Sequence, residues 1–228
     1  MDNTLLIRLE GPLQAWGERA RWSVRDSAPQ PTKSGVVGLL GCALGYRSDD
    51  ELRRLSRSIR LGVRCDRPGS PLVDYHTVVG GVMSADGRVK KTASTGEFET
   101  VVSWRYYLCD ASFLVAVQST PDVVASLSAA IRRPHWVVYL GRKSCPPSRP
   151  LFAGVGDFAS IEAALAAQPV CVPDGAAGDT TRVRAVLECT PAEGVRRREE
   201  ILSRSHRTFA PRYTREVALT VPVHVEEV

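Results

Sequence analysis

The segment from residue 31 to residue 45, PTKSGVVGLLGCALG, constrains the fold more than any other part of the chain. It opens with a proline, two hydroxyls and a lysine and continues as an apolar run with helical spacing, which is typical of a capped helix N-terminus. Free backbone N–H groups, the positive end of the helix dipole and Lys33 converge there, which suits a phosphate. We expect a helix over residues 34–44 whose tip, at Lys33, Ser34 and Gly35, contacts phosphate. An ordinary cap on a packed core helix is the alternative, and the two interpretations are compatible.

Four glycines in this segment, Gly35, Gly38, Gly41 and Gly45, lie close to one helical face. An interior glycine costs roughly 0.5–1 kcal/mol relative to alanine, so several together predict a close backbone approach. The approaching group is either the protein's own sheet or a ligand backbone. The segment is not a nucleotide-binding P-loop, because Thr32 stands where that motif has a glycine before its lysine.

Length and hydropathy set the class of protein. The chain has 228 residues, enough for one large domain or two small ones, and 43% of them are hydrophobic, as in globular proteins. No apolar run approaches the length of a membrane span, and the first residues, MDNTLLIRLE, lack the features of a signal peptide. We therefore expect a cytoplasmic protein with no membrane partner.

The cysteines give no sign of a metal site. There are six, at positions 42, 65, 109, 145, 171 and 189. No two are close enough to form a CxxC pair, which disfavours zinc ligation from a local motif. We expect reduced, mostly buried thiols, with no metal and no cofactor.

The net charge of +5 points to a polyanionic partner. Residues 132–149 carry five cations and no acid, and residues 19–33 carry four cations against Asp26 alone. The arginines at 196–198 are followed at once by two glutamates, so we expect them to form a solvated helix face that compensates its own charge.

The order of predicted elements indicates an α+β fold. It comprises strands over residues 4–10, 61–65, 72–79, 106–117 and 136–140, and helices over residues 34–44, 49–58 and 121–132. This order follows the split βαβ, or ferredoxin-like, plan, which is also that of the RNA-recognition motif. A polar β-hairpin over about residues 80–105 is inserted between the second and third strands, and Asp86-Gly87 is a hairpin turn signal within it.

The chain divides in composition near residue 150. We expect residues 1–150 to form the ferredoxin-like domain. Residues 151–228 form a smaller C-terminal α/β extension or a small second unit, with a helix over 161–168 and strands over 181–189 and 217–225.

Several motifs now occur in a characteristic order, at residues 14–17 (QAWG), 31–41 (PTKSGVVGLLG), 74–77 (DYHT), 107–113 (YLCDASF) and 139–146 (YLGRKSCP). Together they resemble the CasD-type subunits of the type I-E CRISPR surveillance complex, Cascade. That family belongs to the RAMP superfamily of ferredoxin-like RNA-binding proteins. The resemblance spans roughly residues 5–150 and is loose beyond them.

The resemblance implies a role in antiviral DNA targeting. Subunits of this type cap the 5′ end of the guide RNA and hold its repeat-derived handle. Their inserted hairpin, the thumb, packs at the junction of handle and spacer and contacts the backbone subunit CasC. Another face meets the large subunit, so target DNA is an indirect partner. They are not nucleases in this subtype, since the CasE subunit cuts the precursor.

Candidate RNA-binding residues follow from the charge pattern and the resemblance together. They are Arg21, Arg25, Lys33, Ser34, Gly35, Lys90, Lys91, Thr92, Arg105, Arg142 and Lys143. For Arg21, Arg25 and the thumb lysines, free solvation is the alternative. Trp16 either stacks on a base or anchors its loop to the core.

If the protein were an enzyme, His76 would be the candidate catalytic residue, but we expect that it has none. With Tyr75 and a nearby lysine it could act in RNA cleavage, where a base takes the 2′-hydroxyl proton and an acid protonates the leaving oxygen. A structural histidine at a sheet edge is the alternative. A metal-independent endoribonuclease that processes the guide precursor is therefore the competing function, and an RRM-like protein outside CRISPR is the third.

Overall fold

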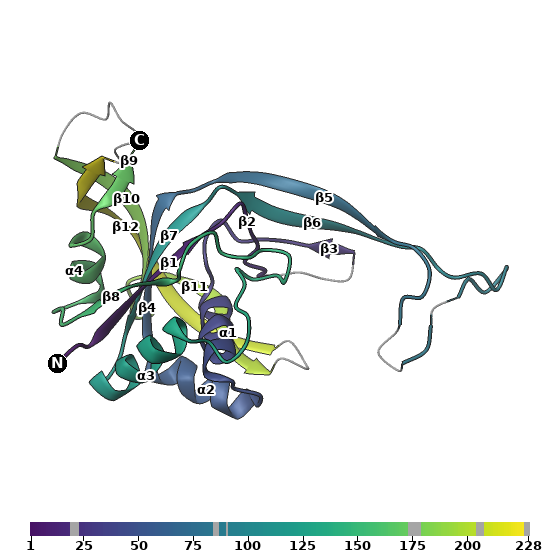
Figure 1. The fold of residues 1–228 in the computed structure, drawn as a ribbon, viewed down its shortest axis with the longest axis horizontal. Helices are drawn as coiled ribbons and strands as arrows, with labels where there is room; N and C mark the ends of the chain where they lie inside the picture. The colour runs from purple at the N-terminus through teal and green to yellow at the C-terminus, as the bar shows by residue number, and fades with distance from the viewer. Residues whose placement is uncertain (19–22, 84–86, 90, 173–178, 204–207, 226–228) are drawn as a thin grey trace.

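A large, strongly twisted sheet forms the body of the molecule (Figure 1). The computed structural model describes residues 1–18, 23–83, 87–89, 91–172, 179–203 and 208–225. Within them, the strand order of this sheet is β11-β12-β10-β4-β7-β1-β8, all antiparallel, and β9 pairs with β12 in parallel. The strands are β1 (Thr4–Glu10), β4 (Arg60–Arg67), β7 (Ser112–Gln118), β8 (Phe152–Gly156), β9 (Val170–Val172), β10 (Thr180–Glu188), β11 (Val195–Ser203) and β12 (Thr208–Val225).

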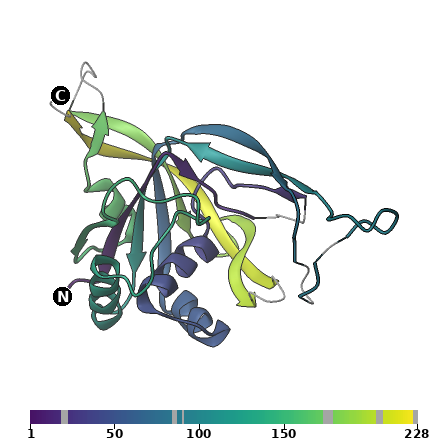
Figure 2. The same ribbon diagram turned by 45° about the vertical axis from the view of Figure 1, so that its right-hand side comes forward.

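A second sheet forms a long arm that leaves the body (Figures 1 and 2). It contains β2 (Leu13–Gln14), β3 (Val24–Arg25), β5 (Ser70–Val78) and β6 (Val101–Cys109). β5 and β6 pair along their whole length, and the described residues between them, 79–83, 87–89 and 91–100, form the arm tip. The inserted hairpin that the sequence predicts over about 80–105 therefore comprises the arm tip and the start of β6.

The helices cover both faces of the large sheet. They are α1 (Lys33–Leu44), α2 (Asp49–Ser58), α3 (Pro121–Arg132) and α4 (Ile161–Ala166). Alternate residues of a strand point to opposite faces, so Leu5 and Ile7 pack with α1, α2 and α3 while Leu6 packs with α4. Burial of both faces explains why Leu5, Leu6 and Ile7 follow one another in β1 without an alternating pattern.

Local capping signals place the helix starts correctly. The Thr32 side chain accepts a hydrogen bond from the Gly35 N–H at 3.2 Å, which caps α1. Ser48 and Glu51 form a reciprocal capping box at the start of α2. The helices predicted over 34–44, 49–58 and 121–132 are thereby confirmed to within one residue.

Two predicted strands are wrong. The strand expected over residues 106–117 is broken at Asp110, whose positive φ of 55° turns the chain, so that its halves become β6 and β7 in different sheets. The strand expected over 136–140 is a loop, because β8 occupies the position beside β1. The helix face expected at 196–198 is also wrong, since those residues lie in β11 and pair with β12.

Strands from both sides of residue 150 join in one sheet. β8 pairs with β1, and β10 pairs with β4. The C-terminal residues thus extend the sheet that the earlier strands begin, and they also supply the hairpin of β11 and β12 at its end.

All six cysteines are free thiols, and Cys65 and Cys145 are buried. Burial raises the pKa of both thiols, so each stays protonated at neutral pH. Among the described residues, no cluster of histidine, cysteine or acidic side chains could hold a metal ion. No helix in these ranges has the length and apolar character that crossing a membrane requires.

Replacing either of two glycines of α1 by alanine should change the stability of the protein, in opposite directions for the two positions. A Cβ at Gly38 meets nothing within 4 Å, so Gly38→Ala should raise the free energy of unfolding by about 0.5–1 kcal/mol through helix propensity. A Cβ at Gly41 lies 2.3 Å from Cδ2 of buried Leu52, so Gly41→Ala should lower it by roughly 1–3 kcal/mol through overpacking. Urea unfolding of both variants checks the pair, and shifts of the same sign would contradict this packing.

Candidate nucleic-acid interface

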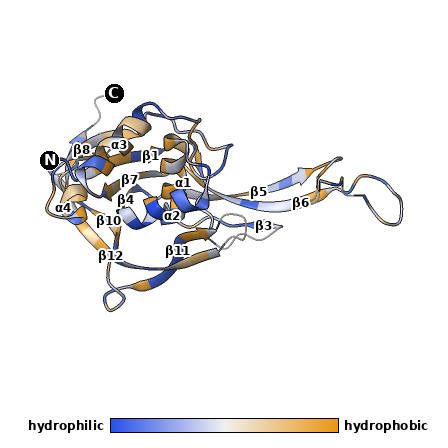
Figure 3. Cartoon of the chain, turned by 90° about the horizontal axis from the view of Figure 1, so that it is seen from below, coloured by the Kyte–Doolittle hydropathy of each residue, from blue (hydrophilic) through white to orange (hydrophobic). Residues whose placement is uncertain are grey.

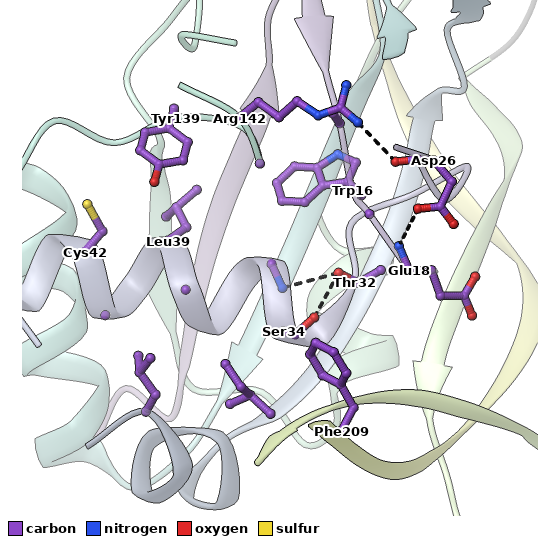
Figure 4. Close-up of a pocket in the computed structure, with 18 of the residues that line it drawn as sticks. Trp16, Glu18, Asp26, Thr32, Ser34, Leu39, Cys42, Tyr139, Arg142 and Phe209 are labelled. Carbon is purple, nitrogen blue, oxygen red and sulfur yellow. Dashed lines mark hydrogen bonds between the residues drawn. The ribbon is translucent and has the colours of Figure 1, made fainter. Parts of the chain in front are cut away.

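A groove with a volume of about 1680 Å³ runs along the exposed side of α1 (Figure 4). The N-terminal loop forms one wall with Trp16, and β11 and β12 form another with Ile201 and Phe209. The loop that follows α3 closes the groove with Tyr139 and Arg142. The groove therefore combines residues from all three thirds of the chain.

The glycine face of α1 has a mixed role. Gly35 faces the Trp16 ring and Gly41 faces Leu52, so at these positions the close approach is to the protein's own side chains. Gly38 lies between them, exposed and with no atom near its missing Cβ. The floor of the groove is thus bare helix backbone at Gly38.

Trp16 anchors its loop to the core. Its side chain is 1% exposed, and the indole N–H donates to the Gln14 side-chain oxygen at 3.0 Å. Its backbone carbonyl accepts from the Ala28 N–H at 2.7 Å. The core-anchor interpretation is confirmed, because the ring has almost no surface left on which a base could stack.

Arg142 lies where the arm, the N-terminal loop and the groove meet (Figure 4). Its guanidinium donates to the carbonyls of Tyr106, Arg25 and Asp26 at 3.0, 2.8 and 3.3 Å. It also lies 4.6 Å from the centre of the Tyr107 ring. These carbonyls hold the guanidinium in place but do not neutralise it, so its charge stays available to an anion.

A sharp turn at Gly141 makes this position possible. Gly141 has a φ of 88°, in the left-handed region, and a Cβ there would lie 1.7 Å from the Ala15 carbonyl oxygen. Only glycine fits so close to the neighbouring backbone. The turn carries the next residue, Arg142, over the base of the arm.

Lys33 departs from the expectation of a phosphate contact. Its side chain is buried, and the ammonium lies 2.9 Å from Glu188 Oε1 and 3.2 Å from the Ile59 carbonyl. Its backbone N–H donates to Glu199 Oε2 at 3.1 Å, and Arg212 donates to the same oxygen at 2.9 Å. A carboxylate of the chain itself thus takes the position at the helix N-terminus that the sequence suggests for phosphate.

The other predicted residues fall into two groups. Arg25, Ser34, Gly35 and Arg142 line the groove together. Lys91 and Thr92 lie on the arm tip, Arg105 lies on β6 with Nε donating to Ser103 Oγ at 3.2 Å, and exposed Lys143 follows Arg142 outside the groove lining. Arg21 and Lys90 lie outside the described residues.

Two groove residues are not among the predicted RNA-binding residues, because the charge pattern of the sequence assigns them to a solvated helix face. Arg196 and Arg198 of β11 line the groove and are exposed. The groove lining then holds four arginines against two carboxylates, those of Glu18 and Asp26. The alternation of outward arginines with inward Arg197 and Glu199 is a strand signal, but a charged run of this kind is also compatible with a helix.

His76 lies on β5, which pairs with β6 on one side and forms the edge of its sheet among the described residues. Its Nδ1 is 3.3 Å from Asp74 Oδ2, and both side chains are partly exposed. Tyr75 points to the opposite face, where its ring makes an edge contact with Trp104 at 5.4 Å. Tyr75 and His76 therefore do not converge on one substrate position.

The comparisons with known proteins agree with this architecture. Residues 4–216 match the family described as "CRISPR-associated protein (Cas_Cas5)". The chain therefore belongs to the CRISPR-associated Cas5 family.

Three individual proteins of CRISPR systems are similar to this chain over most of its length. The Cascade subunit CasD of Escherichia coli strain K12 is 41% identical, and the match covers 72% of this chain and 76% of that one. A chain of a CRISPR RNA-guided surveillance complex superposes with a TM-score of 0.79 at 32% identity, over 96% of this chain and 92% of its own. A crystal structure of a Cas protein gives a TM-score of 0.70 at 34% identity, over 95% and 94%. These matches confirm the resemblance that the sequence motifs indicate.

The burial of Lys33 predicts a structural role that a stability measurement can detect. Lys33→Ala leaves the Glu188 carboxylate, 20% exposed, without its cation, so the free energy of unfolding should fall by about 3–5 kcal/mol. Lys143→Ala, at an exposed position, should change it by less than about 0.5 kcal/mol. Urea unfolding followed by circular dichroism compares the two, and equal stability of the Lys33 variant and the wild type would contradict the buried pair.

Proposed function

We propose that this chain is a non-catalytic, RNA-binding subunit of a Cascade-type CRISPR surveillance complex, and that its groove holds the 5′ handle of the guide RNA. The observation that carries the proposal is the excess of arginine in the groove, four against two carboxylates. A cationic groove suits a single strand, because phosphate contacts that release counterions supply much of its affinity. The names of the Escherichia coli relative and of the surveillance complex give independent support.

The predicted residues take different parts in this proposal. Arg25, Ser34, Gly35 and Arg142 contact the handle in the groove, and Arg105 and Lys143 flank it. Lys91 and Thr92 on the arm tip meet the RNA at the junction of handle and spacer. Arg21 and Lys90, which lie outside the described residues, stay candidate contacts on the charge pattern alone. Lys33 stabilises the fold beneath the groove and does not contact the RNA, since its ammonium pairs with Glu188.

The fold supports an assignment to the ferredoxin-like class. The succession β1, α1, β4, β7, α3, β8 alternates strands and helices as in the split βαβ plan, with α2 added after α1. In the sheet the four strands take the order β4-β7-β1-β8. We place the ferredoxin-like unit in this part of the chain, with β8 as its last strand instead of residues 136–140, and the rest of 151–228 as its extension.

The exposed apolar side chains of the arm tip support a contact with a neighbouring protein subunit. Val79, Met83 and Phe98 of the arm tip are 76, 70 and 57% exposed, and a segment with so little core of its own gains order from neighbours. Hydrophobic and polar residues alternate along this tip in Figure 3. We assign this surface to the CasC backbone subunit and another face to the large subunit, in the cytoplasm, where target DNA is an indirect partner.

The competing function is a metal-independent endoribonuclease, and the contact of His76 with Asp74 is the observation that keeps it in the test. A carboxylate beside an imidazole can orient it as a general base. Membership in the Cas5 family argues against the third candidate, an RRM-like protein outside CRISPR.

Incubation with labelled repeat RNA in the absence of metal decides between binding and cleavage. We expect the wild type and His76→Ala to retard the RNA equally and leave it intact. A discrete product from the wild type that is missing with His76→Ala would establish the endoribonuclease instead.

Two groove variants test the binding site itself. Ser34→Asp places a negative charge in the groove at a helix position where an acid is favourable, so the protein should fold normally but bind the RNA more weakly. Arg142→Gln should reduce the slope of log affinity against log salt by about 0.7, the value for one phosphate contact on a single strand. Arg54→Gln, on the exposed side of α2, is the matched control. Unchanged affinity of Ser34→Asp and an unchanged slope for Arg142→Gln would refute the groove as the handle site.

A further inference from the structure

β11 presents different side chains to its two sides. Arg196 and Arg198 line the groove, whereas Arg197 and Glu199 are not among its lining residues. Arg197 lies 4.0 Å from Glu18, at the edge of the groove, and Glu199 pairs with buried Arg212 at 2.9 Å. β11 thus carries two kinds of charged side chain. Arg197 and Glu199 pair with other residues of the protein, whereas, within the described part of the chain, Arg196 and Arg198 do not.

The alternation of side chains along a strand accounts for this division, and a β-bulge follows it. The register of β11 on β12 shifts between Arg198 and Glu200, directly after Arg198 pairs with Pro211. Proline has no N–H to donate to the ladder, so a bulge is favoured beside it. The extra residue is Glu199, which turns in to accept from the Lys33 N–H at the start of α1. This contact holds β11 against α1 and so keeps Arg196 and Arg198 on the groove.

The charges of these two arginines are not compensated. Within the described ranges, neither forms an ion pair or a hydrogen bond, although most cations around α1 do. Both are exposed, so holding two like charges close together costs little in the free protein. An anion that enters the groove would meet them on one side and Arg142 on the other.

We infer that β11 forms the second wall of the RNA site, and that Arg196 and Arg198 bind successive phosphates of the strand that Arg142 contacts. Residues two apart on a strand are separated by roughly 6–7 Å, which is comparable to the separation of neighbouring phosphates in an extended single strand. Arginine suits this contact, because its planar fork can donate two hydrogen bonds to one phosphate. The inference rests on the proposed function, and it extends the site into the part of the chain where the sequence motifs end.

The test compares two double variants of the full-length protein. Arg196→Gln with Arg198→Gln removes the groove charges of β11, and Arg54→Gln with Arg133→Gln removes two exposed charges elsewhere. Binding of labelled repeat RNA is measured from low to high salt, and urea unfolding shows that both variants are folded. The β11 variant should bind more weakly, with a salt slope lower by about 1.4, the value for two phosphates. The control should keep the wild-type slope.

The outcomes separate the two proposals. If the wild type binds the RNA and the β11 variant keeps its slope, the second wall is refuted while the handle site at Arg142 stands. If the wild type does not bind the RNA, the proposed function fails and the inference fails with it. If RNA binding is unchanged but the β11 variant no longer assembles with the other complex subunits, the arginines serve an acidic protein surface instead, and the inference is overturned.

Discussion

A buried carboxylate at the start of α1 organises the rest of the structure. Glu199 accepts hydrogen bonds from the Lys33 backbone and from Arg212, and the Lys33 side chain pairs with Glu188. These contacts join α1 to β10, β11 and β12 across more than 150 residues of sequence. Removing one partner of a buried pair costs about 3–5 kcal/mol, so few arrangements of the C-terminal hairpin can compete with this one. The position of the groove follows from this network, because it fixes β11 beside α1.

The same network divides the cations of the protein into two kinds. Lys33 and Arg212 are neutralised within the fold, whereas Arg142 is held by carbonyl oxygens and the Tyr107 ring, and Arg196 and Arg198 have no partner among the described residues. A binding site for a polyanion requires cations that have no carboxylate partner. A cation that is already paired would have to give up its carboxylate before it could bind a phosphate. The net charge of +5 is therefore a weaker guide than the partners of each side chain.

Local signals in the sequence predict the helices but not the sheet edges. Thr32 and the Ser48–Glu51 box define helix starts through contacts within three residues, so their meaning does not depend on the fold. The placement of β8 beside β1 and the break at Asp110 depend on which strands pair at long range, which no local pattern contains. The site divides in the same way. Gly35 and Arg142 belong to recognisable motifs. The role of Lys33 depends instead on Glu188 and Glu199, more than 150 positions away, and that of Arg198 depends on the pairing of β11 with β12.

The exposed surfaces indicate that this chain is one part of a larger assembly. The edge contact of Tyr75 with Trp104 lies on the open face of the arm, and both rings are more than 40% exposed. β5 and β6 reach beyond the short strands β2 and β3, and a hairpin with exposed apolar side chains is marginally stable alone, because it buries little area against its own chain. Its length is therefore best explained by contacts made outside the chain. The body supplies a cationic groove and the arm supplies an exposed apolar surface, and this combination fits a chain that works as one subunit of a larger complex.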